Sequence, residues 1–182
     1  MEILQVDGET LNFSATFDAA ISRVGLIYFP DQDGALQGIH ESLRPGGRFA
    51  KITYSTPEMN KIFSNPIGII RRRANLPAPL PGQPGPFSLG QDGILNNLLT
   101  RNGFVQVEVH RIDAPVMMAS VGDYMRFIRE SFGALHQMMA SLSEEEKSDT
   151  WDEIEAALGE FVGTSGFVGP CELLVGVGAR KS

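Results

Sequence analysis

The sequence predicts an α/β fold built around two parallel strands that are joined by one helix. A short apolar run at residues 17–22 is typical of a strand that is buried on both faces of a parallel sheet. Residues 31–43 place apolar side chains at helical spacing, and residues 49–54 form a second strand-like run. Because strand, helix and strand follow one another directly, we expect a βαβ unit with parallel strands and a right-handed crossover.

The predicted helix has recognisable signals at both ends. Asp31 or Asp33 can cap its N-terminus by accepting a hydrogen bond from a free backbone N–H group. Pro45-Gly46-Gly47 ends the helix, because proline lacks a backbone donor and glycine accepts a positive φ. The apolar positions of the helix, spaced three and four residues apart, are Leu36, Ile39 and Leu43.

Other stretches of the chain also show secondary-structure patterns. Residues 3–6 predict a short strand, residues 91–101 a helix, and residues 104–109 an alternating strand. Residues 120–161 are predicted to be helical, with capping boxes that start at Ser120 and Ser143.

The segment between residues 62 and 86 is interrupted by proline. Residues 62–70 predict a short helix that is broken at Pro66. Five prolines between residues 76 and 86 then predict an extended connection with little regular pairing.

The composition excludes several classes of function. Hydrophobic residues at 42% and charged residues at 20% are ordinary for a globular chain, and 182 residues suggest one domain. The net charge of −7 argues against nucleic acid as a partner, since phosphate binding needs a basic surface. The chain has no run of 18 apolar residues and no signal-peptide pattern, so we expect a cytoplasmic protein without a membrane partner.

The sequence offers little for metal or covalent chemistry. The single cysteine, Cys171, allows no internal disulfide and lies in a probable strand, where a small core residue is a better interpretation than a nucleophile. No cluster of histidine and cysteine has metal-ligand spacing, so we expect no metal site.

Four short motifs occur in a fixed order along the first 50 residues. They are Asp7-Gly8-Glu9-Thr10-Leu11, Phe17-Asp18, Pro30-Asp31 and Leu43-Arg44-Pro45-Gly46-Gly47-Arg48. In this order and spacing they resemble the middle of a class I S-adenosylmethionine-dependent methyltransferase. The resemblance is to the small-molecule type that includes the ubiquinone and menaquinone biosynthesis enzymes. The resemblance extends over most of residues 1–112 and resumes at residues 171–180.

This resemblance implies a single methyltransferase-like domain over residues 1–182 that holds only the C-terminal part of the family's fold. The family's strand order is 3-2-1-4-5-7-6, and the chain would supply an incomplete Rossmann-like sheet from the equivalents of strands 3, 4, 5, 6 and 7. The last of these strands would be antiparallel. The family's glycine-rich cofactor loop has no counterpart in the sequence. Residues 55–90 correspond to a variable segment on the substrate side, and residues 113–165 to a helical lid insert.

The resemblance also implies cofactor-binding residues for S-adenosylmethionine. The residue matching Asp7 accepts a hydrogen bond from the adenine amino group, and the backbone at Gly8 meets the adenine ring; the alternative is that Asp7-Gly8 is only a turn. The segment matching Ser22, Arg23, Val24 and Gly25 lies under the methionine part of the cofactor, at the carboxyl end of a strand where open sheets bind ligands. These six residues are the predicted cofactor site.

Tyr28 is the candidate catalytic residue. Its aromatic face could lie against the sulfonium cation or the substrate, and the alternative is that the ring packs under the following helix. Methyl transfer is an in-line displacement that depends mainly on proximity, alignment and exclusion of water, so a strong base is not required.

The sequence predicts one function with one alternative, and it also predicts an oligomeric state. The chain is expected to be a methyltransferase for a small molecule; the alternative is a non-catalytic, methyltransferase-derived module that dimerises or binds a hydrophobic ligand. Without strands 1 and 2 of the family, the strand at residues 17–22 would have an unpaired edge, which proteins avoid. We therefore expect a homodimer in which two copies cover each other's exposed sheet edge.

Overall fold

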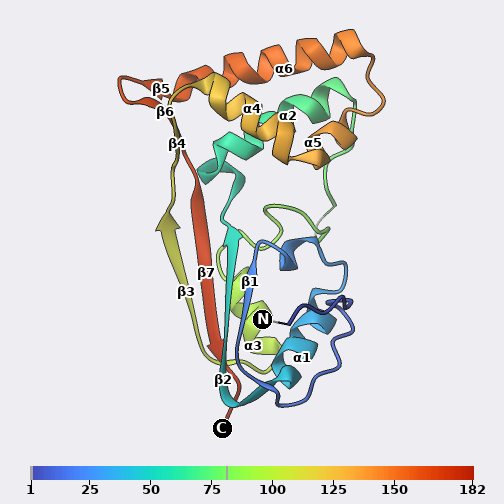
Figure 1. The fold of residues 1–182 in the computed structure, drawn as a ribbon, viewed down its shortest axis with the longest axis vertical. Coiled ribbons are helices and arrows are strands. Elements are labelled where there is room, and N and C mark those ends of the chain that lie inside the picture. The colour runs from blue at the N-terminus through green and yellow to red at the C-terminus, as the bar shows by residue number, and fades with distance from the viewer. Residues whose placement is uncertain (1, 81) are drawn as a thin grey trace. The chain divides into compact units, whose positions relative to one another are not determined.

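The computed structural model of the chain describes residues 2–80 and 82–182. The chain divides into two compact units (Figure 1). The sheet unit contains residues 2–56, 82–112 and 173–182, and the helical unit contains residues 57–80 and 113–172.

A four-stranded mixed sheet forms the centre of the sheet unit, with the strand order β1-β2-β7-β3. Its strands are β1 (Phe17–Arg23), β2 (Leu43–Tyr54), β7 (Glu172–Ala179) and β3 (Val105–Asp113). β1 and β2 are parallel and pair Ala20 with Phe49, whereas β7 runs antiparallel to β2 and pairs Ala179 with Arg48. The predicted α/β class, the parallel pair and the antiparallel last strand are confirmed.

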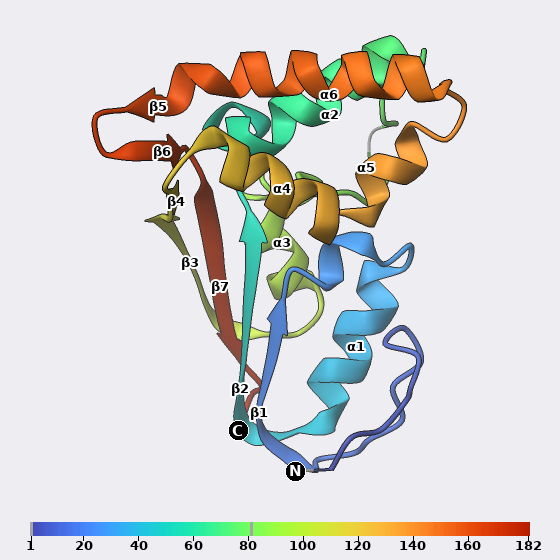
Figure 2. The same cartoon turned by 45° about the horizontal axis from the view of Figure 1, so that its top comes forward.

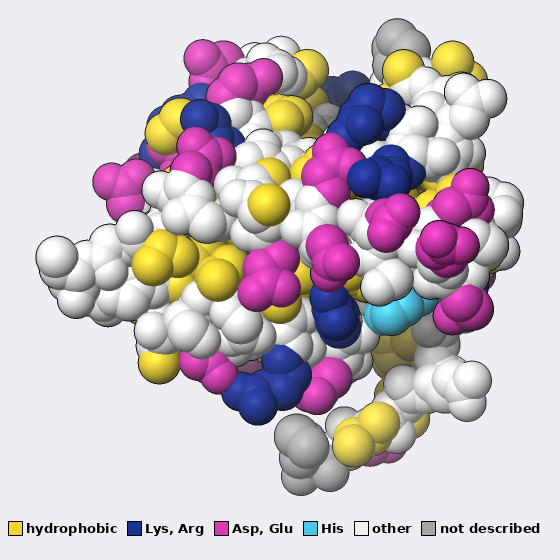
Figure 3. Space-filling view, turned by 90° about the horizontal axis from the view of Figure 1, so that it is seen from above, with side chains coloured by type: hydrophobic (Ala, Val, Ile, Leu, Met, Phe, Trp, Pro, Cys, Tyr) yellow, Lys and Arg dark blue, Asp and Glu magenta, His cyan; other side chains and the backbone are white. Residues whose placement is uncertain are grey.

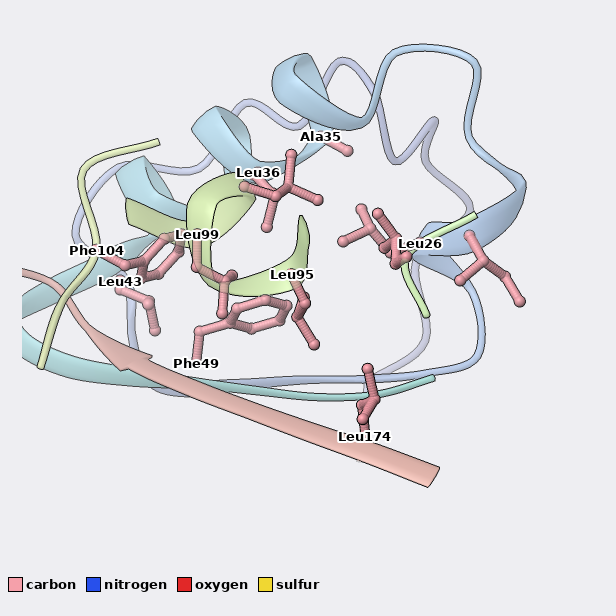
Figure 4. Close-up of a cluster of buried hydrophobic side chains, with 12 residues drawn as sticks. Leu26, Ala35, Leu36, Leu43, Phe49, Leu95, Leu99, Phe104 and Leu174 are labelled. Atoms are coloured by element: carbon pink, nitrogen blue, oxygen red, sulfur yellow. The ribbon is translucent and has the colours of Figure 1, made fainter. Parts of the chain in front are cut away.

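Two helices, α1 (Gln32–Ser42) and α3 (Ile94–Arg101), pack on one face of this sheet. Figure 4 shows the apolar core between these helices and the strands. The core includes Leu36, Leu95, Leu99, Phe49 and Leu174, which come from both helices and two strands. The apolar spacing that predicted each helix therefore marks the side that faces the sheet.

The ends of α1 follow the sequence signals only in part. Asp31 is the N-cap, and its Oδ1 accepts a hydrogen bond from the Gly34 N–H group at 2.8 Å. The helix already ends at Ser42, because Leu43 has an extended backbone (φ −76°, ψ 145°). The predicted stop at Pro45-Gly46-Gly47 was therefore wrong: this turn lies within β2, where Gly46 has a φ of +77°.

The exposure of β1 is the main departure from expectation. The strand was predicted to be buried on both faces, and this is wrong: Ile21 is 87% exposed. The physical reason is that Ile21 points to the face of the sheet away from α1 and α3. In addition, β1 is the edge strand and has a neighbour on one side only (Figures 1 and 2).

No strand forms at residues 3–6 within the part of the chain that is described. These residues have no regular secondary structure, and Ile3 is 82% exposed. A strand needs a neighbour to satisfy its backbone groups, and none of the described strands pairs with this segment. This part of the expected fold was wrong.

The helical unit packs four helices with a small antiparallel sheet of order β4-β6-β5. The helices are α2 (Lys61–Arg73), α4 (Val121–Ser131), α5 (Gly133–Met138) and α6 (Glu144–Leu158). The strands are β4 (Val116–Met118), β5 (Val162–Gly163) and β6 (Gly166–Gly169). Short 3₁₀ turns occur at η1 (Leu26–Tyr28), η2 (Pro57–Met59) and η3 (Gly159–Phe161). Both predicted capping serines accept the expected backbone hydrogen bond, Ser120 from Asp123 and Ser143 from Glu146.

Pro66 does not break α2, contrary to the prediction. The helix continues from Lys61 to Arg73 with Pro66 buried inside it. A proline leaves the carbonyl four residues earlier, here that of Ile62, without its helical donor. The Tyr124 hydroxyl donates to this carbonyl at 3.0 Å, so a side chain from α4 replaces the missing N–H group.

Candidate functional site

The candidate site lies where β1 ends and the chain turns into α1. In an open sheet with parallel strands, this carboxyl edge is where ligands bind. Two segments meet here within the sheet unit: the N-terminal loop around residues 7–10 and the connection at residues 22–31. We refer to this edge as the β1 rim.

Asp7 is exposed and forms a local turn. Its Oδ1 accepts a hydrogen bond from the Glu9 N–H group at 2.9 Å, and its carbonyl accepts one from Thr10 at 3.2 Å. This geometry agrees with the turn interpretation, and it leaves the exposed carboxylate with capacity for a further donor.

Gly8 packs directly against the ring of Phe29. A Cβ atom at Gly8 would lie 2.6 Å from Cζ of this ring, so any other residue at position 8 would force the ring to shift. Beside this contact, Glu9 Oε1 accepts a hydrogen bond from the Asp31 N–H group at 2.7 Å. The N-terminal loop is therefore packed against the segment that follows β1.

The segment Ser22–Gly25 contains backbone strain that sequence reasoning missed. Val24 has a φ of +60°, a region that β-branched residues almost never adopt. Its N–H group donates to the Ile52 carbonyl at 2.9 Å, which holds the backbone in place. Such strain persists only where the surrounding structure enforces it, and it is found preferentially at functional sites.

Tyr28 lies at the end of the same connection, in η1, and is 56% exposed. Partial burial raises the pKa of its hydroxyl above the ordinary value, so the phenol is protonated at neutral pH. Tyr28 can therefore donate a hydrogen bond or present its ring, and it is a poor general base. The alternative prediction, that the ring packs under the following helix, agrees with this partial burial only in part.

The predicted cofactor residues are brought together only in part. The loop of Asp7 and Gly8 contacts Phe29 and Asp31, whereas Ser22 and Gly25 lie close to each other, with Ser22 Oγ 3.6 Å from the position of a Gly25 Cβ. Among the hydrogen bonds of the described residues, none joins Asp7 to residues 22–25. Arg23 is exposed at the last position of β1.

Lys51 is an unusual residue that the prediction did not single out. It lies next to Ser22 in the register of the parallel strands, and it is 1% exposed. Its Nζ has no hydrogen-bond partner among the described residues, and burial lowers its pKa to about 7. The signal in the sequence was a lysine at an inward-facing position of the run Phe49–Tyr54.

Other classes of site receive no support from the described residues. They contain no group of three or more histidine, cysteine, aspartate or glutamate side chains that could hold a metal ion. Burial raises the pKa of the Cys171 thiol, which disfavours the thiolate that a nucleophile would need.

Two surface properties can be stated for the same residues. None of the helices is both long and apolar enough to cross a membrane. On the face drawn in Figure 3, basic and acidic side chains are interspersed rather than gathered by sign.

Comparisons with known proteins agree with this fold. Residues 1–50 match a family profile described as a methyltransferase domain. A solved structure from Bacillus halodurans, assigned as a methyltransferase, aligns with a TM-score of 0.58 at 16% identity and covers 100% of this chain and 78% of that chain. A protein from an antibiotic biosynthesis pathway of Anabaena variabilis, assigned likewise, aligns with a TM-score of 0.57 at 14% identity, covering 94% and 71% of the two chains.

A third structure was solved with ligands. It is the phosphoethanolamine N-methyltransferase 2 of Haemonchus contortus in complex with phosphomonomethylethanolamine and S-adenosylhomocysteine. It aligns with a TM-score of 0.50 at 14% identity, covering 97% of this chain but 36% of that chain. No curated protein matches the sequence. The likeness to these structures is one of fold: the chain has a methyltransferase-like Rossmann fold, and the order β1-β2-β7-β3 corresponds to the expected order 4-5-7-6.

Proposed function

We propose that the chain is an S-adenosylmethionine-dependent methyltransferase that acts on a small molecule. The observation that carries this proposal is the packing of Gly8 on Phe29, because it keeps the Asp7 loop at the same rim as residues 22–25. The family match over residues 1–50 and the methyltransferase-like fold support it.

The side chains of the β1 rim are compatible with the two ends of this cofactor. The exposed Asp7 carboxylate would accept a hydrogen bond from the adenine amino group. The exposed ring of Tyr28 would lie near the sulfonium cation, since an aromatic face attracts a positive charge. Ser22, Arg23, Val24 and Gly25 would contact the methionine part, largely through the strained backbone at Val24.

The chemistry needs little from the side chains beyond positioning. The bound cofactor supplies an electrophilic methyl group, and the acceptor must approach it in line with water excluded. Because Tyr28 keeps its proton at neutral pH, we propose that it orients and shields the reacting groups rather than removing a proton. The substrate-side role of residues 55–90 and the lid role of residues 113–165 remain part of this proposal.

Calorimetric titration with S-adenosylhomocysteine tests the function. We expect binding to the unmodified chain, and at least about 10-fold weaker binding for Asp7→Asn, because a neutral amide oxygen is a weaker hydrogen-bond acceptor than a carboxylate. Asp18→Asn is the matched control: Asp18 is an exposed aspartate of β1 that pairs with Arg44. Absent or millimolar binding by the unmodified chain would favour the alternative, a non-catalytic module.

We also propose that the chain forms a homodimer. β1 is an edge strand with unpaired backbone groups and the exposed side chain of Ile21, and such edges associate. A second copy that covers this part of the sheet would pair these backbone groups and bury the side chain of Ile21.

A further inference from the structure

The face of the sheet that points away from α1 and α3 carries a continuous set of apolar side chains. Phe49, Leu174 and Ala20 pack in the core on the helical side, so the alternate residues of their strands point the other way. We call this second side the open face. Its apolar side chains are Ile21, Ala50, Ile52, Val175 and Val177.

These residues are only partly covered. Ile21 is 87% exposed, and the other four are only half-buried. β1 and β2 are parallel but β2 and β7 are antiparallel, and a sheet with antiparallel strands can leave one face open. Here the core that joins both helices to the sheet lies on the other face.

Two opposite charges flank the apolar strip on the open face. Arg48 on β2 and Glu108 on β3 line the same hollow of about 450 Å³, together with Ala50 and Val177. Arg48 forms no ion pair within the described residues, and the Glu108 carboxylate lies 3.0 Å from His110 Nε2.

The strand order makes this face self-complementary. β2 and β3 are the two neighbours of β7, one on each side. A two-fold axis parallel to β7 therefore places β2 of one copy over β3 of the other. In that arrangement Arg48 of each copy lies opposite Glu108 of the second copy, and Val177 packs against Val177.

We propose that a second copy of this chain packs on the open face, with two symmetric pairs between Arg48 and Glu108. This surface differs from the β1 edge of the homodimer proposed above, and the inference does not depend on methyltransferase activity. In this arrangement β1 and its Ile21 lie outside the contact. The three overlapping strands, with about eight residues each, present roughly 400 Å² per copy, given a strand spacing of ~4.8 Å and a rise of ~3.3 Å per residue. Two copies bury about 800 Å², less than a stable interface buries, so the dimer is weak and dissociates on dilution.

Light scattering coupled to size-exclusion chromatography tests the proposal across a range of protein concentrations. We expect the unmodified chain to approach twice its mass of 19.8 kDa as concentration rises. Arg48→Glu and Glu108→Arg should each weaken the dimer at least about 10-fold, because each creates two like-charge contacts. The double variant Arg48→Glu/Glu108→Arg should restore the dimer, since it exchanges the charges and keeps the pairs.

Matched charge reversals elsewhere serve as controls. Lys61→Glu on α2 and Glu130→Arg on α4 change the net charge equally and should leave the dimer intact. Circular dichroism must show that each variant is folded. A chain that stays monomeric, a dimer indifferent to both single reversals, or a double variant that stays monomeric would each overturn the proposal.

The same samples separate this proposal from the proposed function. A monomer that binds S-adenosylhomocysteine would overturn the open-face dimer and leave the function standing. A dimer that depends on the two charges but does not bind S-adenosylhomocysteine would support the open-face dimer and overturn the proposed function.

Discussion

Val24 holds the most strained backbone of the β1 rim, with a φ of +60° on a β-branched residue. The site therefore has a conformational cost that the rest of the sheet unit must offset, typically about 1–3 kcal/mol. The two neighbours of Val24 in the chain, Arg23 and Gly25, are also predicted cofactor residues. Backbone strain at a residue between two predicted cofactor residues agrees with a ligand-binding role for this segment.

Substitution at Val24 measures this strain. Val24→Gly should be more stable than Val24→Ala by about 1 kcal/mol, because only glycine adopts a positive φ without penalty. Because both variants lose the valine side chain, the free energy lost with that side chain largely cancels in the difference between them. Urea unfolding of both variants provides the measurement.

Ala20→Gly on the same strand is the control for Val24. Ala20 has no positive φ, so glycine there should lower the free energy of unfolding by roughly 0.5–1 kcal/mol. If Val24→Gly were also less stable than Val24→Ala, the backbone strain at position 24 would be negligible.

At the scale of elements, the sequence predicted those parts of the fold that local patterns specify. The parallel pair β1–β2, the helix between them and the capping serines Ser120 and Ser143 follow from spacing and end signals that act within a few residues. The strand at residues 3–6 was wrong because it depends on a neighbouring strand, and the burial of β1 was wrong because it depends on elements that cover both faces of the sheet. No local pattern can supply either.

The candidate site was predictable to a similar extent. The motifs identified the Asp7 loop and residues 22–25, and the structure adds the contact between Gly8 and Phe29. The positive φ of Val24 arises from tertiary packing, so the sequence pattern could not reveal it. The pattern did place Lys51 at an inward-facing position, but only packing shows that its amine has no hydrogen-bond partner among the described residues.

The continuity of α2 through Pro66 has a testable cause. Because the Ile62 carbonyl has no helical donor, Tyr124→Phe should leave it unsatisfied and lower the free energy of unfolding by about 1–3 kcal/mol. In a Pro66→Ala background the alanine N–H group can bond this carbonyl, so the same substitution should cost clearly less.

A double-mutant cycle with urea unfolding measures this coupling between Tyr124 and Pro66. Equal costs of Tyr124→Phe in both backgrounds would show that the hydroxyl does not replace the missing backbone donor. Another interaction would then have to explain why α2 continues through Pro66.

For the whole molecule, the dependence of stability on pH should be dominated by Lys51. Its pKa is about 7 in the folded chain, because burial disfavours the charged amine, and about 10.4 when the chain is unfolded. Between these values the unfolded chain binds more protons than the folded chain, so stability rises with pH from about 7 to about 10 and is level below 7. At 1.36 kcal/mol per pKa unit, the rise is on the order of 4 kcal/mol.

Lys51→Met should remove this dependence and raise stability at pH 7, because an apolar side chain of similar length occupies the buried position without the cost of a charge. Urea unfolding at pH 7 and pH 10 gives the comparison, with the exposed Lys181→Met as the control that should change stability by less than about 0.5 kcal/mol. Since the open-face dimer would also stabilise the folded chain, the measurement belongs at a concentration where the chain is monomeric. A loss of stability in Lys51→Met at pH 7 would mean that the amine has a partner that offsets its burial, and Lys51 would then have to be considered a binding residue of the β1 rim.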